Sequence, residues 1–158
     1  MFIIFDLDHT LIDSSRRQLT KPDGSLDLEH WRENCTREKI MGDTLLPLAM
    51  VARRYMGSSH TVIACTARVM SDIDYEYLVA HSLNFDVVLS RPAGCLDSDH
   101  VLKETLLRRF AQDSRISFNR FASDSITIDD NAKVLEHLEM LGFSCYDAVQ
   151  LNDRGYAI

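Results

Sequence analysis

Short apolar runs alternate along the chain with longer stretches in which apolar residues recur at helical spacing. The runs are rich in β-branched and aromatic residues and lie at residues 2–5, 61–65, 85–89, 126–128 and 145–151. Continuous apolar runs are typical of parallel strands that are buried on both faces. The pattern predicts an α/β fold in which a mainly parallel sheet of about five strands lies between two layers of helices.

Four helices are expected between these strands, at residues 43–57, 71–83, 98–110 and 131–142. Asp43 or Thr44 can cap the first helix, and Pro47 is tolerated in a first helical turn. Gly57 and Gly142 suit the left-handed position that closes a helix.

Two polar stretches do not follow this alternation. Residues 13–42 are rich in charge and contain the turn signal Pro22, Asp23, Gly24. We therefore expect a flap or small cap insertion after the first strand. Residues 112–124 show neither pattern and receive no assignment.

Composition narrows the class of protein. With 158 residues, of which 46% are hydrophobic, the chain suits one compact domain over residues 1–158. The net charge of −7 argues against a broad basic surface for nucleic acid or anionic membrane. The N-terminal apolar run ends at Asp6 and is too short for a signal peptide or a membrane span. The cysteines form no C-x-x-C pair, which argues against a zinc ribbon or a thioredoxin-type site. We expect a cytoplasmic protein with reduced thiols and no membrane partner.

The first apolar run ends in two acids, Asp6 and Asp8. Open α/β sheets bind their ligands at the carboxyl ends of the strands. Neighbouring carboxylates are unfavourable unless positive charge compensates them, and oxygen ligands without a His or Cys pattern favour Mg²⁺. Paired acids after a strand also occur as loop caps, so this feature alone is only a moderate indication of a magnesium site.

Further polar residues follow in a fixed order along the chain. Thr66 comes at the end of the second apolar run, Lys103 lies on a predicted helix, and Asp129 and Asp130 end the fourth run. A hydroxyl can bind a phosphoryl oxygen, and a lysine can balance its charge. The order acid pair, hydroxyl, lysine, acid pair is much more specific than any single member.

This order resembles the haloacid dehalogenase (HAD) superfamily, whose motifs match residues 6–10, Thr66, Lys103 and residues 129–130. Within it, the chain looks most like the 3′-phosphatase domain of phage-type polynucleotide kinase/phosphatase, on residues 44–47, 65–68, 101–104 and 128–130. His9 and Ala67 stand where those proteins commonly have Gly. The P-loop motif of a kinase is absent from the sequence.

The resemblance implies an HAD-type phosphatase with a Rossmannoid sheet and at most a small cap. Asp6 would be the nucleophile, and Asp8 the general acid and base. Mg²⁺ would be held by Asp6, the backbone carbonyl of Asp8 and Asp129, with Asp130 acting through water. Asp130 could also be the N-terminal cap of the helix that begins near Asn131, either in place of its metal role or together with it.

The same resemblance gives Thr66 and Lys103 catalytic roles in binding and neutralising the phosphoryl group, with Arg68 and Arg91 as further substrate-binding candidates. Lys103, Arg68 and Arg91 each have a plain structural alternative. Without its motif neighbours, Lys103 would be a solvated helix residue. Arg68 could pair with Asp72 along a helix, and Arg91 could form a salt bridge within a loop.

The sequence thus predicts a magnesium-dependent phosphomonoester hydrolase that forms an aspartyl-phosphate and acts on nucleic-acid 3′-phosphate ends or nucleotides. One alternative is a small-metabolite or nucleoside monophosphate phosphatase, which the acidic charge slightly favours. A receiver-type signalling module would place its lysine last, whereas Lys103 precedes Asp129. A non-catalytic HAD-like binding module would not need Asp8.

Overall fold

A five-stranded sheet forms the centre of the protein in the computed structural model, which describes residues 1–23 and 27–154. Its strands are β1 (Phe2–Phe5), β4 (Thr61–Thr66), β5 (Val87–Ser90), β6 (Ser125–Asp129) and β7 (Ser144–Asp147). They lie in the order β5-β4-β1-β6-β7, and all neighbouring pairs are parallel. The predicted α/β class and parallel sheet are confirmed.

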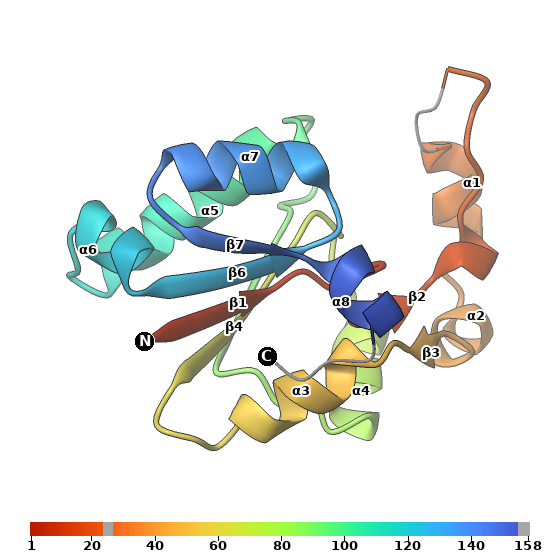
Figure 1. The fold of residues 1–158 in the computed structure, drawn as a ribbon. Coiled ribbons are helices and arrows are strands. Elements are labelled where there is room, and N and C mark those ends of the chain that lie inside the picture. The colour runs from red at the N-terminus through yellow and green to blue at the C-terminus, as the bar shows by residue number, and fades with distance from the viewer. Residues whose placement is uncertain (24–26, 155–158) are drawn as a thin grey trace.

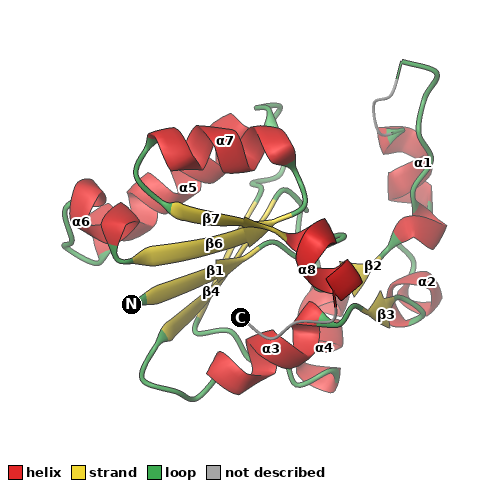
Figure 2. Cartoon of the chain, in the orientation of Figure 1, coloured by secondary structure: helices red, strands yellow, loops and turns green. Residues whose placement is uncertain are grey.

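Helices cover both faces of the sheet (Figure 1, Figure 2). One face carries α5 (Asp99–Asp113), α6 (Phe118–Ser123) and α7 (Ala132–Met140), and the other carries α3 (Leu48–Tyr55), α4 (Asp72–Ala80) and α8 (Ala148–Arg154). Side chains of a strand point alternately to its two faces. In β1, Ile3 and Phe5 therefore join the core under α3 and α4, whereas Ile4 joins the core under α5 to α7. Within the described part of the chain, no helix is long and apolar enough to cross a membrane.

The predicted helix over residues 43–57 begins later than expected, at Leu48. Thr44–Leu45 forms strand β3 instead and pairs in antiparallel fashion with β2 (Ile12–Asp13). This pairing uses backbone groups that a helix would otherwise need, and Pro47 then serves as the N-terminal cap of α3. A contact between segments this far apart in the sequence leaves no local signal.

The predicted last strand over residues 145–151 also differs from the structure. Strand β7 ends at Asp147, whose Oδ1 accepts hydrogen bonds from the amides of Val149 (2.8 Å) and Gln150 (3.3 Å). These bonds turn the chain into helix α8. The unassigned stretch at 112–124 contains the short helix α6.

Residues 13–42, here called the flap, lie at one end of the sheet (Figure 1). The described part contains η1 (Ser15–Arg17), α1 (Leu28–Glu33) and α2 (Arg37–Met41). Gly24, the last residue of the expected turn, lies outside the described residues. Helix α2 packs on α4, where Arg37 forms an exposed ion pair with Glu76, and Ile40 enters the main core.

Arg17 is the buried anchor of the flap and is only 1% exposed. Its guanidinium donates to the carboxylate of Asp43, with Nη2 at 2.7 Å and Nε at 3.0 Å from Oδ2. The same guanidinium lies 4.4 Å from the centre of the Trp31 ring, which belongs to α1. The hydroxyl of Tyr77 in α4 donates to the carbonyl of Asp43 at 2.9 Å. These contacts join the start of the flap to Asp43, directly after its end, and they join Asp43 to helix α4.

The two ion pairs of the flap predict very different effects on stability. Asp43→Ala would leave the Arg17 guanidinium buried without its partner and should lower the free energy of unfolding by about 3–5 kcal/mol. Arg37→Ala is the matched control, since breaking an exposed pair changes this free energy by about 1 kcal/mol or less. Urea unfolding measures both. Equal effects of the two substitutions would show that the buried pair does not anchor the flap.

Candidate active site

Three strands, β4, β1 and β6, end side by side at the carboxyl end of the sheet, here called the catalytic edge. Because β1 lies between β4 and β6, the residues at their carboxyl ends converge there, as open α/β sheets require of a ligand site. Asp6 follows β1 and remains bound to β6, since its amide donates to the carbonyl of Ile128 at 3.0 Å. Thr66 and Asp129 are the last residues of β4 and β6.

Lys103 reaches this edge from α5 and is buried. Its Nζ lies 2.9 Å from Oδ1 of Asp6 and 2.6 Å from Oδ2 of Asp129. Burial lowers the pKa of the ammonium, but the two carboxylates more than offset this and hold that pKa above its ordinary value. The alternative of a solvated helix residue is therefore wrong. The structure brings Lys103 together with the first and last acid motifs.

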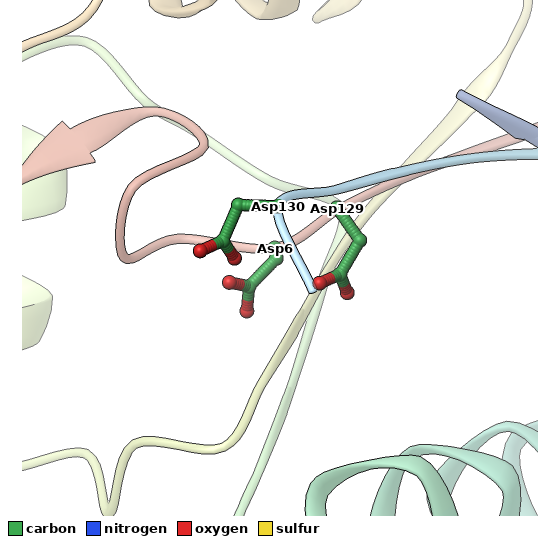
Figure 3. Close-up of side chains that lie close together, drawn as sticks. All are labelled: Asp6, Asp129 and Asp130. Carbon is green, nitrogen blue, oxygen red and sulfur yellow. The ribbon is translucent and has the colours of Figure 1, made fainter. Parts of the chain in front are cut away.

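The carboxylates of Asp6, Asp129 and Asp130 form a cluster, with one oxygen of each within 4.8 Å of the others (Figure 3). Burial raises the pKa of Asp6 well above its ordinary value, and Asp129 and Asp8 raise it further against the opposing effect of Lys103. Burial and Asp129 raise the pKa of Asp130 to about 6. One lysine thus leaves negative charge in the cluster uncompensated. A set of ligands made only of oxygen atoms with such a charge fits Mg²⁺.

The loop after β6 is fixed by its own side chains. Oδ1 of Asp129 accepts from the amide of Asn131 at 3.0 Å, and the side chain of Asn131 accepts from the amide of Lys133 at 3.0 Å. Asn131 therefore caps helix α7. The alternative role of Asp130 as this cap is wrong, which leaves its carboxylate with the acid cluster.

Asp8 lies beyond the acid cluster and faces the flap. Its carboxylate accepts hydrogen bonds from Arg68 and from the hydroxyl of Ser14, the latter at 2.5 Å. Burial acts to raise the pKa of Asp8, but the charge and hydrogen bonds of Arg68 outweigh it, and the net shift is downward. The Asp8 side chain is thus directed to Arg68 and Ser14, and among the described residues it is not a member of the cluster of Asp6, Asp129 and Asp130.

Arg68 is buried between two acids. It donates from Nη1 to Asp74 at 2.6 Å as well as to Asp8, and Trp31 lies 5.6 Å from its guanidinium carbon. Its partners are therefore Asp8 and Asp74, and the pairing with Asp72 is not the one observed. The amide of Arg68 donates to the hydroxyl oxygen of Thr66 at 3.1 Å, which holds that side chain at the catalytic edge.

Arg91 forms the loop salt bridge that was the alternative to a substrate contact. Its Nη2 donates to Asp99 at 2.8 Å, and its other nitrogens donate to the carbonyls of Ala67 (2.8 Å), Cys95 (3.1 Å) and Asp97 (2.8 Å). The Arg91 side chain thus ties the loop after β5 to the loop after β4.

His9 stands where the HAD superfamily commonly has Gly. The backbone conformation at this position explains the common preference for Gly. The φ of 58° at His9 lies in the left-handed region, which costs about 1–2 kcal/mol for a residue with a side chain. The amide of His9 donates to the carbonyl of Ile12 at 2.8 Å, and its ring nitrogen Nε2 lies 2.8 Å from Oε1 of Gln18. These contacts hold the tight turn that follows Asp6 and Asp8.

Sequence reasoning missed two residues of the site, Ser14 and Asp74. Asp74 carries a recognisable signal, because Ser71 and Asp74 have the spacing of a capping box and form one at the start of α4. That signal places a helix end and gives no hint of the bond to Arg68. Ser14 lies in the polar flap, where no spacing rule distinguishes it from its neighbour Ser15.

Sequence comparison finds a match along nearly the whole chain. A family model described as bacteriophage T5 5′-deoxynucleotidase matches residues 1–155. The 5′-deoxynucleotidase of Escherichia phage T5 is 34% identical over 173 aligned positions, which cover 96% of this chain and 68% of that protein.

Solved structures share the fold at much lower identity. A chain of the Pnkp1/Rnl/Hen1 complex has a TM-score of 0.67 at 20% identity, covering 93% of this chain and 44% of that chain. A haloacid dehalogenase-like hydrolase from Streptococcus pneumoniae has a TM-score of 0.65 at 16% identity, covering 92% of this chain and 82% of that chain. A HAD family enzyme from Bacteroides thetaiotaomicron, solved with magnesium and inorganic phosphate, has a TM-score of 0.50 at 12% identity, covering 92% of each chain.

These matches confirm the HAD-like Rossmannoid fold and the phosphatase class that the motifs predicted. The chain therefore belongs to the bacteriophage T5 5′-deoxynucleotidase family of HAD-fold phosphatases.

Proposed function

We propose that this phosphatase hydrolyses deoxynucleoside 5′-monophosphates in a magnesium-dependent reaction that passes through an aspartyl-phosphate on Asp6. The observation that carries the proposal is the position of Asp6 at the end of the central strand, paired with Lys103 and beside two further acids. A carboxylate held in this way, with positive charge next to it, is suited to attack a phosphate monoester.

The first step would be an in-line attack by a carboxylate oxygen of Asp6 on phosphorus. A bond from Asp6 to phosphorus forms while the ester bond breaks, and Asp8 donates a proton to the departing oxygen. In the second step water attacks the phosphorus and gives a proton to Asp8, the bond between Asp6 and phosphorus breaks, and inorganic phosphate leaves as the Asp6 carboxylate is restored. Arg68 lowers the pKa of Asp8, which favours the basic form that the second step needs. An approaching phosphate dianion favours the protonated form that the first step needs.

The phosphoryl group carries charge that the site must neutralise, because phosphate monoesters react very slowly without catalysis. Lys103 would balance the charge on the equatorial oxygens, and the hydroxyl of Thr66 would donate to one of them. A direct substrate contact by Arg68 or Arg91 would require breaking the protein hydrogen bonds that these guanidinium groups make.

Mg²⁺ would be held by Asp6, the backbone carbonyl of Asp8 and Asp129, with Asp130 in support. Bound there, it would supply a Lewis acid that screens the nucleophile from the incoming phosphate. The gathering of three carboxylates around a single lysine supports this assignment, because a divalent cation would compensate the remaining negative charge. The similar fold of an enzyme that was solved with magnesium and phosphate points the same way.

The family name supports free deoxynucleotides as substrates, and the net charge of −7 is less suited to a polynucleotide. Nucleic-acid 3′-phosphate ends are the second candidate, since residues 44–47, 65–68, 101–104 and 128–130 resemble the phage-type 3′-phosphatase domain.

A panel of substrates separates these candidates. With Mg²⁺, we expect the highest kcat/KM for deoxynucleoside 5′-monophosphates, and lower values for oligonucleotides phosphorylated at the 3′ or 5′ end. Asp6→Asn should reduce phosphate release from every substrate by roughly 10³-fold or more, since the nucleophile is gone. A preference for 3′-phosphorylated oligonucleotides would contradict the proposed substrate, and no release even from an aryl phosphate would contradict the reaction.

Removal of the metal should abolish turnover, and Mg²⁺ should restore it. Asp130→Asn should raise the Mg²⁺ concentration for half-maximal activity by about 10- to 100-fold, because a supporting group of the metal site is lost. Asp113→Asn, at an exposed acid at the end of α5, is the matched control and should leave the curve unchanged. Undiminished activity after exhaustive chelation would contradict a magnesium-dependent reaction.

A further inference from the structure

Asp8 is the residue at which the flap meets the catalytic edge, and its carboxylate is held from two sides. Arg68 donates from Nε to Oδ2 at 3.1 Å and from Nη2 to Oδ1 at 2.5 Å. Ser14, near the start of the flap, donates from its hydroxyl to Oδ1 at 2.5 Å. Arg68 is itself fixed by Asp74. Bonds from two partners to both carboxylate oxygens restrict the rotation of the Asp8 side chain.

The hydroxyl of Ser14 has its direction set by a second bond. Nε2 of Gln18 donates to Oγ of Ser14 at 3.2 Å. A hydroxyl carries one hydrogen, so with Gln18 supplying a donor, that hydrogen is directed to Asp8. Oε1 of Gln18 in turn accepts from Nε2 of His9 when this nitrogen carries the proton. His9, Gln18, Ser14 and Asp8 therefore form one continuous chain of hydrogen bonds.

The backbone of Ser14 is as well fixed as its side chain. Ser14 is fully buried, and its carbonyl accepts from the amide of Arg17 at 2.9 Å in the turn of η1. Arg17 is the anchor of the flap through Asp43 and Trp31. The hydroxyl that reaches Asp8 is thus carried by a rigid part of the flap.

We propose that Ser14 is a positioning residue that aims the Asp8 carboxyl at the leaving-group oxygen, so that the flap takes part in catalysis by orienting the acid. The inference rests on the proposed function, in which Asp8 protonates that oxygen. A general acid works only within hydrogen-bond reach of its target, and a displacement of about 1 Å can reduce a rate by about 100-fold.

Two substrates with different leaving groups test this role. A deoxynucleoside 5′-monophosphate releases an alkoxide, which needs a proton, whereas p-nitrophenyl phosphate releases a stable phenolate, which does not. The constant kcat/KM covers the steps up to departure of the leaving group. It therefore excludes the hydrolysis of the aspartyl-phosphate, which the two substrates share.

Ser14→Ala should reduce kcat/KM for the nucleotide by about 10- to 100-fold and for the aryl ester by less than about threefold. Gln18→Leu, which leaves the Ser14 hydroxyl in place but removes the bond that directs it, should give the same selectivity to a smaller degree. If Ser14→Ala does not fold, the Gln18→Leu variant alone tests the positioning role of Ser14. Ser15→Ala is the matched control, because Ser15 is exposed and its amide bonds to Asp13 instead. Its two kcat/KM values should equal those of the unaltered protein.

Equal losses on both substrates, or no loss on either, would overturn the positioning role. Asp8→Asn separates this failure from that of the proposed function. If Asp8→Asn loses activity selectively on the nucleotide while the Ser14 and Gln18 variants do not, only the role of Ser14 is wrong. If Asp8→Asn shows no selectivity, the acid role of Asp8 is wrong, and the inference about Ser14 falls with it.

Discussion

The buried ammonium of Lys103 is the group on which the rest of the site depends. Carboxylates at the end of a central strand lie away from water, and buried charges are tolerated only when they are paired and hydrogen-bonded. Lys103 meets this need by contacting Asp6 and Asp129 together. The contact requires β1 and β6 to be neighbours and α5 to pack on the sheet beside them. The charge balance of the site therefore depends on the topology of the sheet.

The site has two halves with opposite electrostatic character. On one side, Asp6, Asp129 and Asp130 outnumber the single lysine, and burial together with the neighbouring carboxylates raises the pKa of Asp6 and of Asp130. On the other side, Arg68 lowers the pKa of Asp8, although only Leu7 separates Asp8 from Asp6 in the chain. The tight turn at His9 directs these neighbours to different partners. One strand end thereby presents the two acids that the proposed mechanism uses as nucleophile and proton carrier.

Much of this could be predicted from the sequence, because parallel strands carry strong local signals. The apolar runs located the five strands of the sheet, and the strand-terminal polar residues located Asp6, Thr66 and Asp129. Two of the errors arose where distant contacts decide local structure. Thr44–Leu45 is a strand only because β2 lies beside it. Ser14 matters only because the flap folds back onto Asp8. No periodicity or spacing within either segment reports such a contact.

Trapping the covalent intermediate tests the central claim most directly. Asp8→Asn should form the aspartyl-phosphate from a radiolabelled aryl phosphate but hydrolyse it slowly, because the base for the attacking water is missing. After acid quench and proteolysis, we expect the label on the N-terminal peptide that contains Asp6, and none when Asp6 is also replaced by Asn. Release of phosphate without labelled protein at any time, or label on a peptide that lacks Asp6, would contradict the account.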